Sequence, residues 1–488
     1  MEVVTMKKFL CALLSLLLAG STLLSLASCG ETQDNPTDTD NVTTSEKETD
    51  ENGAYETIEK EKYGREFVFY LREDWTEQFV AEAYTGELLG DAIYERNITV
   101  ANDFDVTYQY HTGTYDQINN DLRLQVSGGL DEFDLYESHL ASFSACAQNG
   151  YCYNMASVDT LNLDAEWWDQ ACVENLSIGG KTYMITGDID PKTMLTSSCM
   201  VVNKKLLENQ KKNVNDLYEL ADNGDWTLDA LYEYSKDVTM DLDGDDAINF
   251  KDDLYGFVGW SADASFALFY GAGGRFVTVT DGTPELSYSV ENITNIFEKI
   301  YKVVVAQQGY YATDPAESSE PYNVFIAGRA LFSDVNLRKL DSMGITEMSD
   351  PYGILPCPKY DVNQPEYLGF INGSVPMVMV ANNNKDIDFV GHILDAMAAF
   401  NYDKVTPILF EVSTKLQAAQ DPDSAAMVDY IIRNHIYDLA YFGNFGLPGL
   451  VHNALSDKQS SIASTLKTQE KIAAKTLSKI INDYNRHK

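Results

Sequence analysis

EFVFYL at residues 66–71, DAIYERN at 91–97 and VTYQY at 106–110 decide the fold class of this chain. The first and third segments are rich in β-branched and aromatic residues, which favours strands. The segment between them has helical spacing and continues to Asn102. A strand, a helix and a second strand in this order predict a parallel pair joined by a crossover helix, and hence an α/β fold.

The same alternation continues along the chain. Residues 116–127 have helical spacing, and another strand begins at 133–136. Ser198–Asn203 is predicted as a strand, and Thr227 as the N-cap of a helix. Close to the end of the chain, one face of a long helix is predicted to be apolar, with Ile462, Leu466, Ala473, Leu477, Ile480 and Tyr484 on it.

The N-terminus has three zones in the order that export requires. Lys7 and Lys8 precede a nearly continuous apolar run over residues 9–26, and Ser28-Cys29 follows. This order resembles the signal peptide of bacterial lipoproteins, which implies that residues 1–28 are removed and that Cys29 receives a diacylglycerol. A transmembrane helix is the alternative, since about 18 apolar residues approach the length of a membrane span. The acidic segment that follows favours the lipoprotein reading.

That acidic segment is predicted to be a disordered tether over residues 29–62. Residues 30–62 hold eleven Asp or Glu against three Lys, with hardly an apolar side chain. Such a composition cannot bury enough surface to offset the entropy of ordering, and like charges extend it. Two acyl chains on Cys29 would anchor the chain stably to the outer face of the cell membrane.

Composition narrows the function classes of the remaining chain. A net charge of −40 argues against nucleic-acid binding, which needs a basic surface. The sequence contains no HExxH, no GxSxG and no P-loop, so we expect a protein that is not an enzyme. Paired carboxylates for glycoside hydrolysis remain open, because some of 75 acidic residues will always lie close together.

Five cysteines lie beyond Cys11 and Cys29, an odd number that cannot form a complete disulfide framework. They show no CxxC pair for zinc, and we expect most of them to be small buried side chains. A bridge between Cys146 and Cys152 remains open on spacing.

The sharpest local motif is DLDGDDAINFKD at residues 241–252. Oxygen ligands at positions 1, 3, 5, 9 and 12, with a backbone carbonyl at position 7, suit Ca²⁺, which takes six to eight oxygens. Asp246 stands at position 6 instead of Gly, although Asp tolerates the left-handed conformation better than most residues. A solvated acidic turn is the alternative. The predicted structural calcium ligands are Asp241, Asp243, Asp245, Ala247, Asn249 and Asp252.

Nine segments follow one another in a set order across nearly all of residues 63–400. They are DAIYERN (91–97), AQNG (147–150), WWD (167–169), GKTYMITGD (180–188), VVNKKLL (201–207), GDWT (224–227), YGF (255–257), FIAGRALF (325–332) and YGILPCPK (352–359). None is specific alone, but in this order they resemble the extracellular solute-binding proteins of ABC importers, in the sugar-binding branch that includes maltose-binding protein.

The resemblance implies a two-lobed α/β fold of the type II periplasmic-binding-protein class, with discontinuous lobes joined by a hinge. Lobe 1 is expected to hold residues 63–186 and 330–385, and lobe 2 residues 187–329 and 386–488. Ligand is expected between the lobes, beyond the strand ends, and to close the hinge.

Aromatic rings that stack on sugars and polar groups that hold hydroxyls make the expected site. Trp226 precedes a helix N-cap and is expected to be structural. Trp75 and Trp260 lie in loops that face ligand in the resembled family, and polar residues after the strands or at the crossings complete the set. The predicted ligand contacts are Trp75, Asp74, Ser138, His139, Asp190, Trp260, Asp263, Asn336 and Ser374, with Ser142, Asp188, Arg338 and Asn372 as neighbouring candidates.

The resulting hypothesis is a monomeric receptor that captures a solute, a mono- or oligosaccharide by resemblance, and delivers it to an ABC permease in the membrane. A peptide or another polar solute remains open as the ligand. The alternatives from other classes are a secreted carbohydrate-active enzyme such as a glycosidase, and a surface adhesin without a small ligand.

Overall fold

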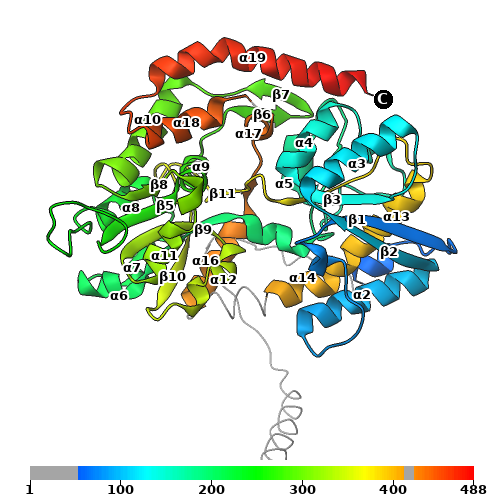
Figure 1. Cartoon of the computed structure of the whole chain (residues 1–488), viewed down its shortest axis with the longest axis horizontal. Helices are drawn as coiled ribbons and strands as arrows, with labels where there is room; N and C mark the ends of the chain where they lie inside the picture. The colour runs from blue at the N-terminus through cyan, green and yellow to red at the C-terminus, as the bar shows by residue number, and fades with distance from the viewer. Residues whose placement is uncertain (1–52, 411–421, 444, 488) are drawn as a thin grey trace, which may run out of the picture. The chain divides into compact units, whose positions relative to one another are not determined.

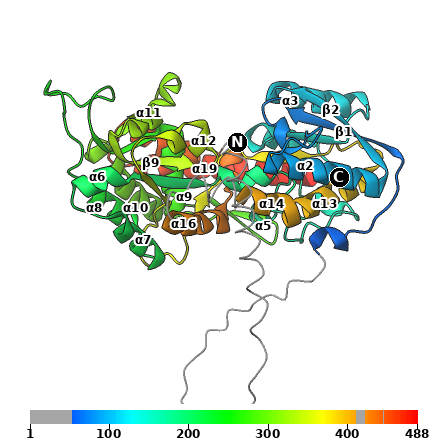
Figure 2. The ribbon, with the colours of Figure 1, turned by 90° about the horizontal axis from the view of Figure 1, so that it is seen from below.

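A computed structural model describes residues 53–410, 422–443 and 445–487. These residues belong to one compact unit that contains two α/β lobes, each with its own sheet (Figures 1 and 2). The predicted signal peptide, Cys29 and most of the predicted tether lie outside the described residues. Within the described part, no helix combines the length and apolarity that a membrane crossing requires.

Lobe 1 is built on a four-stranded sheet of order β12-β3-β1-β2. β1 pairs in parallel with both β2 and β3, as the alternation of strands and helices predicts, whereas β12 runs antiparallel to β3. The strands are β1 (Arg65–Arg72), β2 (Val106–Gly113), β3 (Leu135–His139) and β12 (Pro376–Met379). The helices are α2 (Leu88–Phe104), α3 (Tyr115–Gly128), α4 (Leu140–Gln148), α5 (Gln170–Leu176) and α13 (Ile387–Phe400).

Lobe 2 is built on a five-stranded sheet of order β10-β4-β9-β5-β8. β4 runs antiparallel to β9 and β10, and β5 pairs in parallel with β8 and β9. The strands are β4 (Ser198–Asn203), β5 (Tyr255–Trp260), β8 (Tyr310–Ala312), β9 (Ala330–Asn336) and β10 (Tyr352–Pro356). The helices are α6 (Lys204–Asn209), α7 (Val214–Asp222), α8 (Leu228–Ser235), α9 (Ser261–Gly271), α10 (Val290–Tyr301), α11 (Glu320–Ile326), α12 (Lys339–Ser342), α16 (Pro422–Arg433), α17 (Leu439–Phe442) and α18 (Leu447–Ser456).

The lobe boundaries differ from those predicted. β9 and β10 belong to the sheet of lobe 2, so the return to lobe 1 comes later than residue 330. α13 packs in the core of lobe 1, where its Phe389 contacts Phe67 of β1, although this segment was predicted in lobe 2. Spacing predicts that a segment is a strand or a helix, but it does not predict which of two sheets a strand joins.

The described structure includes residues before the predicted end of the tether. Ala54–Thr57 form a short 3₁₀ helix, and Tyr55 is 5% exposed. The backbone N–H groups of Ala54 and Tyr55 donate to the Asp403 carboxylate at 2.9 Å. Tyr55 also packs against Phe400 of lobe 1, so an aromatic anchor fixes a segment whose composition alone predicts disorder.

Three segments cross between the lobes. The first leads from an isolated bridge between Ile185 and Val378 through a 3₁₀ helix (Pro191–Thr196) into β4. The second runs from a two-stranded ladder of β11 (Gly369–Phe370) and β13 (His435–Ile436) into β12. The third connects α13 and α14 (Thr406–Ile408) with α16, and it includes residues 411–421, which lie outside the described part. Each lobe is therefore discontinuous in sequence, as predicted.

The last helix, α19 (Ala463–Arg486), contacts both lobes. It packs on α10, α18 and the β6–β7 hairpin (Val277–Thr280 and Thr283–Leu286) of lobe 2, and on α4 of lobe 1 (Figure 1). Its buried side chains are those of the predicted apolar face. At its end, the Tyr484 ring lies 5.0 Å from that of Tyr183, and Lys181 Nζ donates to the Tyr484 carbonyl at 2.8 Å.

The five described cysteines are buried free thiols. Cys146 and Cys152 therefore do not form the bridge that their spacing left open. The Sγ atom of Cys152 instead lies 3.6 Å from Met379 Sδ, and burial raises the pKa of the Cys146 thiol to about 11.

Candidate functional site

A cavity of about 630 Å³ lies between the lobes. Its lobe 1 wall follows the carboxyl end of β1, and its lobe 2 wall follows the carboxyl ends of β5 and β9. The crossing segments contribute Thr196, Asn372 and Ser374. Open α/β sheets place ligand sites beyond the carboxyl ends of their strands, and this volume is typical of small-molecule pockets.

On the lobe 1 side, the aromatic ring of Trp75 is covered by two guanidinium groups. Arg72 of lobe 1 lies 4.1 Å from the ring centroid, and Arg338 of lobe 2 lies 4.8 Å from it. Arg72 Nε also pairs with Asp74 at 2.6 Å. Trp75 is only 5% exposed as a result, so a sugar ring can stack on it only after a guanidinium has moved aside.

On the lobe 2 side, a lysine organises the wall. Lys339 Nζ lies 2.5 Å from Asp263 Oδ2 and 3.4 Å from the Tyr322 hydroxyl. The Lys339 backbone N–H donates to Asn336 Oδ1 at 2.9 Å, which fixes the start of α12. Asp334 lies buried behind this wall, where burial and then the charge of Asp263 hold its pKa well above the ordinary range.

Six of the nine predicted contacts line this cavity: Asp74, Trp75, Trp260, Asp263, Asn336 and Ser374. The other three, Ser138, His139 and Asp190, do not line it. Ser138 is fully buried because β3 is paired on both sides, and His139 packs its ring against Trp75 at 6.3 Å. Asp190 is buried and caps the 3₁₀ helix of the first crossing.

Arg72, Tyr322 and Lys339 also line the cavity, although no prediction from the sequence named them. Arg72 directly follows the first predicted strand, and Lys339 follows the candidate Arg338, so their positions carried a usable signal. Tyr322 lies in α11, before the FIAGRALF segment, and no motif marks it.

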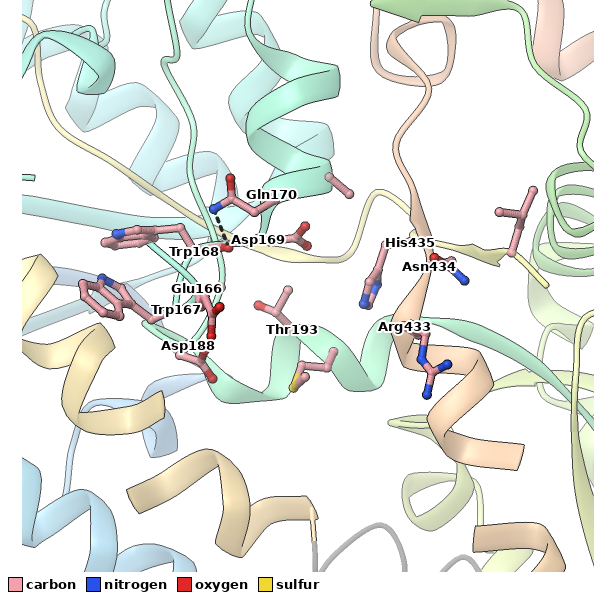
Figure 3. A pocket seen from close by; sticks show the side chains of 14 residues that line it. Glu166, Trp167, Trp168, Asp169, Gln170, Asp188, Thr193, Arg433, Asn434 and His435 are labelled. Carbon is pink, nitrogen blue, oxygen red and sulfur yellow. Dashed lines mark hydrogen bonds between the residues drawn. The ribbon is translucent and has the colours of Figure 1, made fainter. Parts of the chain in front are cut away.

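A second cavity of about 410 Å³ lies where the crossing segments meet (Figure 3). Trp167, Trp168 and Asp188 line one side, Arg433 and His435 the other, with Thr193 between them. The indole N–H groups of both tryptophans donate to Asp395 Oδ1, at 2.7 and 2.9 Å. Both rings are thereby fixed within lobe 1, which gives them a structural role.

Asp188 is a buried acid on the first crossing. Its carboxylate accepts a hydrogen bond from the Thr406 hydroxyl, and its carbonyl accepts one from Asn401 Nδ2 at 2.6 Å. Burial raises the pKa of Asp188 from its ordinary value of 3.8 to about 7, against the Thr406 hydrogen bond, which lowers it.

Asparagine in place of Asp188 is expected to remove a pH-dependent loss of stability. Because the folded pKa is raised, the native state holds the proton more tightly than the unfolded chain, and native stability falls as pH rises from about 4 to about 7. The free energy of unfolding of the variant, relative to the native protein, should rise by up to about 4 kcal/mol over this interval. Urea unfolding at several pH values measures this difference, with exposed Asp164→Asn as the control. A difference that stays flat with pH would contradict the expectation.

The predicted calcium loop lies between α8 and β5 as a series of turns. The carboxylates of Asp241, Asp243 and Asp253 lie within 4.8 Å of one another. Asp246 has φ of 65°, the left-handed conformation that its position in the motif requires. The Asp241 carboxylate accepts N–H groups of Gly244 and Asp246, and the Gly244 hydrogen bond lowers its pKa.

Asp253 takes the place predicted for Asp252 in this cluster. It is fully buried, and its two carboxylate oxygens accept the N–H groups of Leu242 and Asn249 at 2.8 Å. It thereby joins both ends of the loop, whereas Asp252 lies outside the cluster. Carboxylate oxygens grouped within this distance are the kind of ligand that a hard cation takes.

By sequence, no protein-family profile and no curated protein matches the chain. By structure, it is similar to M. tuberculosis UspC, with 14% identity, a TM-score of 0.54, and 84% of this chain and 100% of that one covered. It is also similar to an ABC transporter solute-binding protein from Thermotoga lettingae bound to α-D-tagatose, with 13% identity and a TM-score of 0.52 over 86% of this chain and 100% of that one. A cyclo/maltodextrin-binding protein in complex with maltotetraose gives 13% identity and a TM-score of 0.52 over 86% and 96%. The chain therefore has the two-lobed type II fold.

Proposed function

We propose that this chain is the monomeric extracellular receptor of an ABC importer, which captures a sugar between its lobes and delivers it to a membrane permease. The observation that carries the proposal is the cavity between the lobes. Residues that follow the carboxyl ends of β1, β5 and β9 meet there with residues of two crossing segments. Capture works without turnover when the ligand favours the closed arrangement of the lobes.

The cavity chemistry favours binding over glycoside hydrolysis. A glycosidase needs a protonated carboxyl group beside the scissile bond. The two carboxylates that line the cavity, Asp74 and Asp263, are each held in an ion pair, with Arg72 and Lys339. Asp334 has a raised pKa, but it is fully buried behind the wall.

The proposed ligand is a mono- or oligosaccharide. Two similar structures hold α-D-tagatose and maltotetraose, a monosaccharide and a short oligosaccharide. The cavity of this chain offers the same kinds of group that sugars need: the ring of Trp260, the amides of Asn336 and Asn372, and the hydroxyls of Tyr322 and Ser374.

A thermal-shift screen over sugars and peptides tests the proposal, with chromatography of the same mixtures. A receptor is stabilised by its ligand, by RT ln(1 + [L]/Kd) in free energy, so its melting temperature rises. Chromatography then recovers that ligand intact. Released sugar fragments would identify a glycosidase instead. Stabilisation by a peptide but by no sugar would change the ligand class. Stabilisation by neither would favour the alternative of an adhesin without a small ligand.

We also propose that a diacylglycerol on Cys29 anchors the chain to the cell membrane, as the apolar run and the small residues before Cys29 suggest. The native chain expressed in a bacterial host is expected to partition into detergent and to carry the mass of the lipid. Cys29→Ser is expected to abolish both properties. A chain that keeps residues 1–28 at full mass would instead favour the transmembrane alternative.

We propose that the loop at 241–252, with Asp253, holds a structural calcium ion through Asp241, Asp243 and Asp253. When bound, calcium would neutralise carboxylates that otherwise repel one another. Asp245 and Asn249, which accept backbone N–H groups within the same loop, would complete the set with the Ala247 carbonyl.

Calcium is expected to raise the melting temperature by a few degrees, because an ion at about 100 times its Kd adds about 2.7 kcal/mol to stability. The double variant Asp241→Asn with Asp243→Asn should lose this increase. Asp246→Asn is the matched control, since it removes a charge from the same loop but leaves the cluster intact. An unchanged melting temperature of the native protein at millimolar calcium would contradict the proposal.

A further inference from the structure

Helix α19 carries a row of lysines on its outer face. Lys467, Lys471, Lys475 and Lys479 follow one another at intervals of four residues, and all four are exposed. At about 100° per residue they lie opposite the apolar face, which packs against both lobes. We call these four residues the lysine face.

The lysine face is poorly neutralised by the described part of the chain. Lys479 pairs with Asp483 at 2.7 Å. Lys467, Lys471 and Lys475 form no ion pair with described residues within 4 Å. Lysines four residues apart on a helix repel one another and weaken it, so this arrangement opposes helix stability until an anionic surface meets it.

The sign of this face is opposite to that of the chain as a whole. The chain has a net charge of −40, with 75 acidic residues against 35 basic ones. α19 nevertheless holds five basic residues and two acidic ones, Glu470 and Asp483. The charge of this face is therefore a local property of α19, and it is unlike the rest of the chain.

We propose that the lysine face binds the phosphate headgroups of an anionic lipid bilayer. Basic residues on a helix are drawn to anionic headgroups within about a Debye length, roughly 8 Å at physiological ionic strength. Ile472, which is 53% exposed on the same side of the helix, adds an apolar contact at the interface.

The proposal gives the receptor a defined orientation on the membrane. The proposal depends on the proposed lipid anchor of Cys29 in one respect: the anchor keeps the chain close to a bilayer. Because α19 packs against α10 and α18 of lobe 2 and against α4 of lobe 1, its contact with lipid would hold both lobes at one distance from the surface (Figure 1).

Sedimentation with lipid vesicles tests the proposal, with the mature chain carrying Cys29→Ser so that no lipid anchor contributes. Vesicles of equal parts phosphatidylglycerol and phosphatidylcholine are compared with phosphatidylcholine alone, at low salt and at about 0.5 M salt. The test variant replaces the four residues of the lysine face by glutamine. The matched control replaces four exposed lysines outside α19: Lys62, Lys205, Lys251 and Lys385.

The native chain is expected to bind the anionic vesicles, to lose that binding at high salt, and to ignore phosphatidylcholine. The test variant should partition at least about tenfold more weakly, and the control should bind as the native chain does. Equal binding by the test variant, or equal loss by the control, would overturn the proposal. Binding to soluble polyphosphate without binding to vesicles would overturn it in favour of a polyanion. Melting curves without ligand verify that each variant is folded. Melting curves with the sugar ligand test the proposed function by themselves, so a failure of sugar binding is distinguished from a failure of vesicle binding.

Discussion

Alanine in place of Trp260 is expected to weaken sugar binding by about 30-fold, which corresponds to about 2 kcal/mol. Trp260 ends β5 in lobe 2 and lines the cavity between the lobes. It remains partly exposed, whereas the ring of Trp75 is covered by Arg72 and Arg338. Trp260 is therefore the aromatic surface that a ligand meets first, and isothermal titration with a sugar from the thermal-shift screen measures the loss.

The melting temperature of Trp260→Ala should stay close to that of the native chain, because the side chain is not part of a buried core cluster. Tyr84→Ala is the matched control, since Tyr84 is an aromatic residue that is 59% exposed and lies outside the cavity. If Trp260→Ala binds the sugar as tightly as the control does, the ligand does not stack on this ring.

Alanine in place of Trp226 is expected to lower the free energy of unfolding by about 3–5 kcal/mol, since it empties the volume of a large side chain in the core. Trp226 is fully buried in lobe 2, where its ring lies 5.8 Å from that of Phe332. Its indole N–H donates to the Pro356 carbonyl at 2.9 Å, which joins the segment before α8 to the end of β10. Urea unfolding measures the loss.

Trp226→Phe separates the two contributions to this loss. Phenylalanine keeps most of the apolar volume but cannot donate to Pro356, so it should cost less than alanine and about 1–3 kcal/mol in all. If both variants unfold at the same urea concentration as the native chain, Trp226 does not stabilise lobe 2. The structural role predicted from its place before the N-cap is then wrong.

Local patterns predicted the type of most elements because they depend on neighbours in the sequence. β4 has the predicted bounds, and the Thr227 hydroxyl accepts the Ala230 N–H at 3.2 Å, as an N-cap does. The apolar face of α19 follows from one helical period. Partners that lie far apart in sequence were not predictable in this way, which is why β9, β10 and α13 were placed in the wrong lobes.

Among the residues of the site, too, those placed by local sequence could be predicted, and those placed by distant contacts could not. Asp74, Trp75 and Asn336 could be predicted because they lie at or just after the carboxyl ends of strands, and such ends meet at one edge of a sheet. Ser138 was expected just after its strand, but β3 extends to His139 because it pairs with β12, and that pairing joins residues more than 230 positions apart. Tyr322 reaches the cavity through the packing of α11 against β5 and β9, which no local motif encodes.

The discontinuity of lobe 1 has a consequence for synthesis of the chain. β1 (Arg65–Arg72) shares a sheet with β12 (Pro376–Met379) and a core with α13 (Ile387–Phe400). A growing chain therefore cannot close this lobe until residue 400 has left the ribosome, and contacts so distant in sequence form slowly. Lobe 1 of the nascent polypeptide therefore stays incompletely folded through most of translation, and its first strands wait for partners that are made more than 200 residues later.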